Sequence, residues 1–165
     1  MNDILYSPWR DTYVSQKKVD GCVFCNIATN GDDRLLFEDD YCFIVMNKYP
    51  YTPGHFMIIP KFHTDSLEEL DPKAWQHISL LAQNGVALLK NVLNAQGVNL
   101  GMNLGAVSGA GIAQHIHLHL VPRWGGDVNF MTSICETRVY STDFDEIFEK
   151  LKENSVKYFT HVTIR

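Results

Sequence analysis

His115-Ile116-His117-Leu118-His119 is the stretch that decides the fold of this chain, because polar and apolar residues alternate along it with a period of two. The alternation continues from residue 113 to residue 121, which predicts a strand with three imidazoles on one face and aliphatic side chains on the other. Imidazole can attack as a nucleophile, donate a proton or stabilise charge near neutral pH, and a phosphate chain can lie along such a row. Alternating histidines also suit a metal site, so that alternative remains open.

The length and charge of the chain bound its class. Its 165 residues suffice for one domain with a sizeable core, and the formal net charge of -5 argues against a broad nucleic-acid-binding surface. The first residues lack the basic start and apolar run of a signal peptide, and no apolar stretch reaches the length of a membrane span. We therefore expect a cytoplasmic protein that binds neither membrane nor nucleic acid, with its four cysteines as reduced thiols or metal ligands.

Short apolar runs predict further strands. The runs at 41–45 and 56–59 are bounded by turn residues. Alternation at 98–104 predicts another strand, before the loop that leads to the three histidines. Residues 156–164 are expected to form a last strand.

Two helices are predicted. Asp71 and Pro72 suit the cap and the first turn of a long helix, whose apolar residues follow at helical spacing until Gly97 ends it. A second helix, from about residue 143 to residue 154 and capped by Thr142, carries apolar side chains on one face. Helices do not alternate regularly with strands, so we predict an α+β domain with a mainly antiparallel sheet.

One domain is expected to occupy residues 1–165, because no internal repeat or low-complexity segment is visible. Residues 1–20 are expected to form an N-terminal arm anchored by Trp9 and Tyr13. Residues from about 131 to 165 are expected to form a C-terminal extension.

The triad resembles the signature of the histidine triad family of nucleotidyl hydrolases and transferases, in which histidines alternate with apolar residues. The first half of the family pattern is present in the same order, as Asn47, Pro50, Pro53-Gly54-His55, Ile58-Ile59-Pro60-Lys61 and His63. Two separated motifs agree over about residues 20 to 130, which implies the HIT-like fold. Residues 122–130 most resemble the bacterial branch that cleaves diadenosine tetraphosphate by phosphorolysis, a relative of the fragile histidine triad hydrolases.

The resemblance implies a mechanism centred on His117. This histidine would attack the α-phosphorus of a nucleoside phosphoanhydride, and water or phosphate would resolve the covalent nucleotidyl-imidazole. Its reacting nitrogen must be unprotonated, so its other nitrogen is expected to donate to a backbone carbonyl. His119 would contact the phosphate and help the leaving group, while His115 and His55 would support the geometry.

The resemblance also implies a nucleotide site around the triad. Asn47 stands where family members bind the ribose hydroxyls, and Asn103 resembles the phosphate-contacting amide. A glycine-rich stretch can expose successive backbone donors to phosphate, and the expected residues are Gly109, Gly111, Ile112 and Ala113. Many members carry glutamine or serine where this chain has Gly111, so we expect contact through the backbone alone there.

Several of these residues also have an ordinary structural interpretation. Arg123 can steer anions because guanidinium matches phosphate geometry, but a surface salt bridge is an equal alternative. Asn47, His55 and Asn103, taken alone, would be ordinary turn or edge residues. The glycines at 109 and 111 do not form a dinucleotide-binding fingerprint, and taken alone they mark a flexible loop.

Cys22-Val23-Phe24-Cys25 is a pair of cysteines with metal-binding spacing, but a closed zinc site needs two further ligands. The resemblance implies that His63 and His115 complete the site, although many relatives keep the pair without a metal. A redox role is disfavoured because no thioredoxin-like pattern surrounds the pair. Cys42 and Cys135 are expected in the core, and His77 and His161 are expected to be structural or exposed.

Three functional hypotheses follow. The leading one is an enzyme that cleaves a dinucleoside polyphosphate such as diadenosine tetraphosphate, or a nucleotide adduct such as a phosphoramidate. The second is a nucleotide-binding or scaffold protein with little turnover, and the third is a zinc-bound structural domain. No organic cofactor is expected beyond the possible zinc ion, and the resemblance implies a homodimer or an assembly of dimers.

Overall fold

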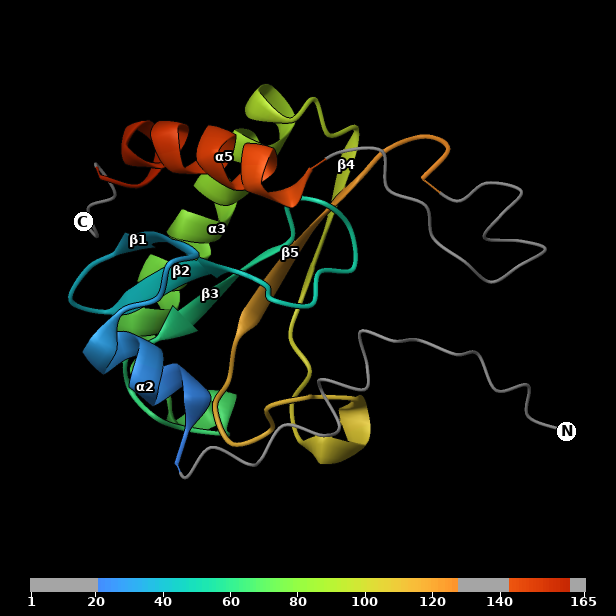
Figure 1. Cartoon of the computed structure of the whole chain (residues 1–165). Coiled ribbons are helices and arrows are strands. Elements are labelled where there is room, and N and C mark those ends of the chain that lie inside the picture. Colours follow the sequence, from blue (N-terminus) through green and yellow to red (C-terminus); the bar gives the residue numbers. More distant parts are fainter. Residues whose placement is uncertain (1–20, 128–142, 161–165) are drawn as a thin grey trace, which may run out of the picture.

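The computed structural model describes residues 21–127 and 143–160, and its centre is a five-stranded sheet in the order β1-β2-β3-β5-β4 (Figure 1). Every paired strand in it is antiparallel, which confirms the predicted α+β class. The strands are β1 Leu35–Glu38, β2 Cys42–Met46, β3 Phe56–Pro60, β4 Gly97–Gly101 and β5 Leu118–Arg123. The helices are α2 Val23–Asn30, α3 Pro72–Val92 and α5 Phe144–Phe159, with short 3-10 turns at Leu67–Glu69 and Ala106–Ser108. The N-terminal arm, Cys135 and His161 lie outside the described residues.

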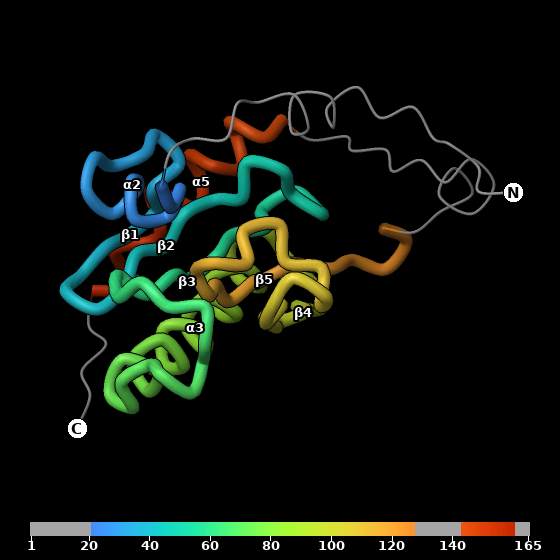
Figure 2. The backbone as a smooth tube through the Cα atoms, turned by 90° about the horizontal axis from the view of Figure 1, so that it is seen from below, coloured from blue at the N-terminus to red at the C-terminus, as the bar shows by residue number. Residues whose placement is uncertain are grey.

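Helices cover both faces of the sheet. The long helix α3 and the C-terminal helix α5 pack together over one face, where the larger core lies. The short helix α2 packs on the opposite face through Phe24 and Ile27 (Figures 1 and 2). Among the described helices, none has the length and apolar character that a membrane span requires.

The two central strands β2 and β3 are buried along their whole length. Alternate residues enter the two cores: Phe43 and Val45 face α2, whereas Ile44 packs with α3 and α5. A strand covered on both faces reads as a continuous apolar run, which is the pattern that predicted these strands.

Helix α3 begins as predicted but ends earlier. The Asp71 carboxylate accepts hydrogen bonds from the backbone N–H groups of Lys73 (2.8 Å) and Ala74 (3.2 Å), and Pro72 occupies the first turn. The predicted end at Gly97 is wrong, because the last helical residue is Val92. Asn94 takes a left-handed conformation (φ 53°), which turns the chain out of the helix toward β4.

The triad strand has the predicted alternation but a later start. Ile116, Leu118 and Leu120 all enter the core beneath α3, so the aliphatic face is confirmed. The strand itself begins at Leu118, because the N–H of Ile116 donates to the carbonyl of Thr64 (2.8 Å) rather than to a neighbouring strand. The predicted strand at 98–104 likewise ends at Gly101.

The C-terminal helix α5 is longer than predicted. Its N-cap is Asp143, whose carboxylate accepts a hydrogen bond from the N–H of Asp145 (2.7 Å), rather than Thr142. Buried residues recur at intervals of four, at Ile147, Leu151, Ser155 and Phe159. That helical face continues to residue 159, so the strand predicted at 156–164 is wrong over the described part of its range.

Candidate active site

Three histidines meet where the loop between β2 and β3 lies against the start of β5. The ring centroids of His117 and His119 are 4.7 Å apart, and those of His55 and His119 are 5.1 Å apart. His55 comes from the far end of the β2–β3 loop, 64 residues before His119. The structure therefore brings together the predicted nucleophile, the predicted leaving-group residue and the histidine of the first motif.

The β2–β3 loop is tied down at several points. The N–H of Asn47 donates to the carbonyl of His55 (3.0 Å), and the N–H of His55 donates to the carbonyl of Thr52 (3.1 Å). The Thr52 hydroxyl donates to the carbonyl of Pro122 on β5 (2.9 Å). Gly54 has a φ of 84° and lies so close to Leu93 that a side chain there would collide with it. These contacts hold His55 in a fixed place.

His117 is oriented for attack on an electrophile. Its Nδ1 lies 2.9 Å from the carbonyl oxygen of His115, and a carbonyl can only accept, so Nδ1 carries the proton. The lone pair therefore resides on Nε2, as the sequence predicted. The side chain is 6% exposed, and burial lowers the pKa of His117 below its usual value despite the opposing hydrogen bond. The ring packs 5.0 Å from that of Phe24 on α2.

A chain of hydrogen bonds sets the protonation of His119. The N–H of Tyr51 donates to Nδ1 of His55 (3.1 Å), so the proton of His55 resides on Nε2. That Nε2–H donates to Nδ1 of His119 (2.9 Å), which leaves the N–H of His119 on its Nε2. Burial, with the neighbouring histidines, lowers the pKa of His55 to about 3 and the pKa of His119 to about 4. Both rings are therefore neutral near pH 7, and His119 offers a donor rather than a charge.

Acid should destabilise the protein through His55. Between pH 6.5 and about 3 the folded state leaves His55 neutral while the unfolded chain binds a proton there, so stability falls as pH falls. The expected slope is about 1.4 kcal/mol per pH unit from this group. His119, whose pKa is also lowered, adds to the slope of the native protein, so we expect urea unfolding at pH 6 and pH 5 to show a slope that is shallower in His55→Gln by about the contribution of His55. Equal slopes in the two proteins would remove His55 as the cause.

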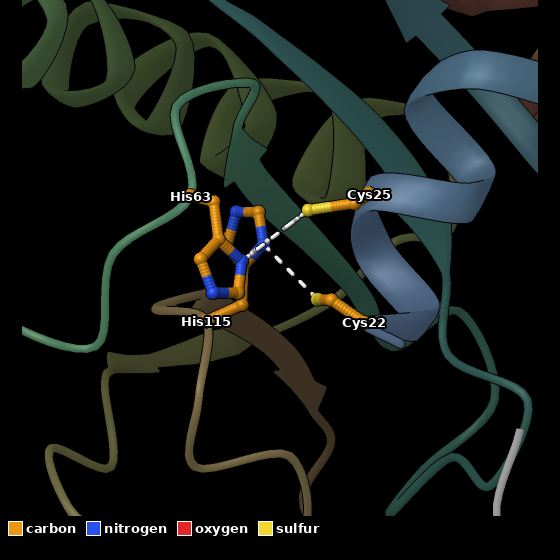
Figure 3. A group of neighbouring side chains, drawn as sticks. All are labelled: Cys22, Cys25, His63 and His115. Atoms are coloured by element: carbon orange, nitrogen blue, oxygen red, sulfur yellow. Dashed lines mark hydrogen bonds between the residues drawn. The ribbon is translucent and has the colours of Figure 1, made fainter. Parts of the chain in front are cut away.

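A second cluster joins two cysteines to two histidines. Cys22 and Cys25 stand at the start of α2, His63 follows β3, and His115 precedes β5 (Figure 3). Nε2 of His115 donates to the carbonyl of Pro60 (2.8 Å), so its Nδ1 presents a lone pair to the thiols. Burial lowers the pKa of His115, which favours the neutral imidazole that a metal requires.

The spacing of these four donors fits a tetrahedral zinc ion. With Zn–N near 2.05 Å and Zn–S near 2.3 Å, tetrahedral edges are about 3.3 Å between nitrogens and about 3.6 Å between nitrogen and sulfur. The two Nδ1 atoms lie 3.3 Å apart, and the nitrogen–sulfur pairs lie 3.3, 3.4 and 3.7 Å apart. The predicted ligand set is therefore brought together, and these four donor–donor distances match the edges of a tetrahedral zinc site.

The two predicted amides lie near the histidines in different ways. Asn47 accepts a hydrogen bond from the N–H of Tyr49 through its Oδ1 (2.9 Å), and its Nδ2 lies 3.4 Å from Nδ1 of His55. Asn103 lies two residues beyond Gly101, whose Cα pairs with that of His119 across the sheet. Both positions border the histidine site.

The glycine-rich segment before the triad offers fewer backbone N–H donors to phosphate than predicted. The N–H of Gly109 donates to the carbonyl of Ala106 (3.2 Å) and closes a 3-10 turn. Ile112 packs against the core beside α2, and Ala113 leads into the triad. Phosphate donors in this segment are therefore expected after Gly109 rather than at it.

Arg123 pairs with a carboxylate. Its guanidinium donates to both oxygens of Asp127 (2.5 and 2.9 Å) and to Oδ1 of Asn99 (2.9 Å). Four residues of strand place it about 13 Å along β5 from His119. The structure thus shows the salt bridge that was the alternative interpretation of this residue, at a distance from the histidines.

Two contacts were not predicted from the sequence. His77 is buried, and its Nε2 lies 2.5 Å from Oδ2 of Asp39. Burial alone would raise the pKa of Asp39, but hydrogen bonds from His77 and from two backbone N–H groups lower it. The ring of Tyr51 stacks on that of His55. Neither contact has a local signal, because each depends on how distant elements pack.

The chain resembles known proteins along most of its length. The model of the HIT domain family matches residues 28–126, which is more than half of the chain. The chain is 41% identical over 146 residues to a Mycobacterium tuberculosis protein named AP-4-A phosphorylase, and this match covers 82% of the chain and 75% of that protein.

Solved structures share the fold. A zinc-bound histidine triad family protein from Mycobacterium smegmatis superposes with a TM-score of 0.68 at 29% identity, over 82% of this chain and 94% of that one. Plasmodium falciparum diadenosine triphosphate hydrolase superposes with a TM-score of 0.61 at 20% identity, over 78% of this chain and 80% of that one. The second likeness concerns the fold alone.

Proposed function

The chain belongs to the HIT domain family, and from that premise we propose that it cleaves a dinucleoside polyphosphate, such as diadenosine tetraphosphate, through a nucleotide bound covalently to His117. The observation that carries the proposal is the hydrogen bond from Nδ1 of His117 to the carbonyl of His115 (2.9 Å). That bond leaves a lone pair on Nε2 of a buried, neutral imidazole, which is the state that a nucleophile needs.

The first step forms the covalent intermediate. Nε2 of His117 attacks the α-phosphorus, and the bond from that phosphorus to the bridging oxygen breaks. With diadenosine tetraphosphate, AMP remains on the imidazole and ATP leaves. The Nε2–H of His119 points its donor at the charge that develops on the departing oxygen, since its Nδ1 is occupied by His55.

The second step releases the nucleotide. Water or phosphate attacks the same phosphorus from the side that the leaving group vacated, and the electron pair of the N–P bond returns to His117. Phosphate is the proposed acceptor because the M. tuberculosis relative is named a phosphorylase. Asn47 is proposed to bind the ribose. Asn103, together with the backbone of residues 111–113, is proposed to bind the phosphates.

We further propose that Cys22, Cys25, His63 and His115 hold a structural zinc ion. Its support is the match of donor distances to a tetrahedron and the zinc-bound M. smegmatis neighbour. All four positions would be filled by protein, so such an ion would cross-link three segments and leave no place for substrate. His115 would then serve the site through its backbone carbonyl and the metal through its ring.

The acceptor can be read from the products. With millimolar phosphate, diadenosine tetraphosphate should give ADP and ATP at an increased rate, whereas water as acceptor gives AMP and ATP. Anion-exchange chromatography separates the three nucleotides, and chloride at the same ionic strength is the control for a general salt effect. AMP and ATP as the only products under both conditions would make the protein a hydrolase and end the phosphorylase proposal. Absence of any cleavage would end the enzymatic one.

A further inference from the structure

Tyr51 forms an exposed aromatic surface beside the histidines. Its ring stacks on that of His55, with centroids 4.9 Å apart and an angle of 21° between the planes. The same ring leans toward His119, with centroids 6.1 Å apart. Half of the residue (50%) is exposed. Tyr51 therefore contributes little to the core and presents aromatic surface to solvent directly beside the histidines.

The order of the neighbouring rings relates Tyr51 to the leaving-group side of the proposed reaction. His117 neighbours His119 (4.7 Å between centroids), and His119 in turn neighbours Tyr51. In a displacement at phosphorus the leaving oxygen departs roughly in line with, and opposite to, the attacking atom. Because His119 is the donor for that oxygen, the departing chain runs past His119 toward Tyr51.

We propose that Tyr51 is the stacking platform for the base of the second nucleoside, the one that leaves with the polyphosphate. This inference rests on the proposed function, since it assigns the far half of the same substrate. Stacking on an aromatic ring tolerates any base, because every base has a π-face. The subsite should therefore distinguish a dinucleoside polyphosphate from a mononucleoside polyphosphate more strongly than one base from another.

The platform is held in place before substrate binds. The N–H of Tyr51 donates to Nδ1 of His55, which is fully buried, and the next residue, Thr52, is anchored to β5. A ring already fixed in its bound position loses little freedom on binding, so more of the stacking energy appears as affinity. The contact to His55 uses the backbone, and substitution of the side chain leaves it in place.

Two substrates that differ only in the second nucleoside test the subsite. Diadenosine tetraphosphate and adenosine 5′-tetraphosphate present the same α-phosphorus, but only the first carries a second base. For Tyr51→Ala we expect KM for the dinucleotide to rise on the order of tenfold, which is typical for loss of one base–aromatic stack, with KM for the mononucleotide unchanged. Tyr51→Phe, which keeps the ring, should retain the discrimination. Trp75→Ala is the control, an exposed aromatic residue on α3 outside the histidine site.

The same discrimination should appear in binding without turnover. Calorimetry in a His117→Ala background gives the Kd of each polyphosphate, so the subsite is measured even if the native protein cleaves neither compound. Loss of cleavage with retained discrimination by Tyr51 would count against the proposed function and for the subsite. If Tyr51→Ala weakens both ligands alike, the ring only positions the histidines. If it weakens neither, the ring is not a binding surface, and either result overturns the inference.

Discussion

His117→Gly should lower kcat for diadenosine tetraphosphate by several powers of ten, because it removes the nitrogen that we propose carries the nucleotide covalently. The lone pair on Nε2 and the low pKa of the buried ring are the properties that the variant loses. Steady-state assays give the rate, and acid-quenched protein incubated with substrate labelled at the α-phosphorus reveals the covalent nucleotide. Added imidazole should restore part of the rate in His117→Gly, since it can occupy the vacated space.

His77→Ala provides the matched control for that variant. Both histidines are 6% exposed, so both substitutions remove a buried imidazole and leave a cavity. His77 pairs with Asp39 rather than with the triad, and its loss should reduce stability while turnover persists. Activity of His117→Gly within about tenfold of the native rate would exclude His117 as the nucleophile.

Cys22→Ser combined with Cys25→Ser should abolish zinc binding and lower the melting temperature. Elemental analysis of protein purified without chelator is expected to give about one zinc ion per chain in the native protein and none in the double variant. Loss of a structural metal belongs to the changes that cost about 4 kcal/mol or more. At about 2–4 °C per kcal/mol for a chain of this size, the melting temperature should fall by roughly 8–16 °C.

Cys42→Ala controls for the loss of a thiol as such. Cys42, the first residue of β2, is fully buried on the α3 side of the sheet, and burial raises the pKa of its thiol well above the usual value. The variant should therefore lose packing energy but keep its zinc. Native protein that contains no zinc, or a double variant that retains it, would contradict the proposed ligand set.

Sequence patterns predicted the parts of the fold that depend on neighbouring residues. The alternation around His117 and the cap at Asp71 are local signals, and both are confirmed. Helix α2 was not predicted, because eight residues are too few to show a helical period. The end of α3 was misplaced because Asn94, rather than a glycine, takes the left-handed position. The assembly into dimers stays a prediction.

The site was predictable only as far as the resemblance reached. It supplied His55 and His63, which lie 64 and 52 residues from their triad partners and have no signal of their own. The proton positions follow from contacts with backbone groups, which a sequence does not display. Tyr51 was not predicted as a site residue, because loop geometry rather than residue type places its ring on His55.

One peptide unit links His117 to the cysteine–histidine cluster. The carbonyl of His115 holds the proton of His117, while the ring of the same residue faces Cys22 and Cys25. Between the two histidines stands Ile116, whose side chain is anchored in the core. A single-residue insertion between His115 and His117 would turn these two side chains to opposite sides of the chain. Evolution can therefore change either site more easily at its other residues than at residues 115–117. A redesign of the metal ligands must likewise leave the backbone of residues 115–117 unchanged.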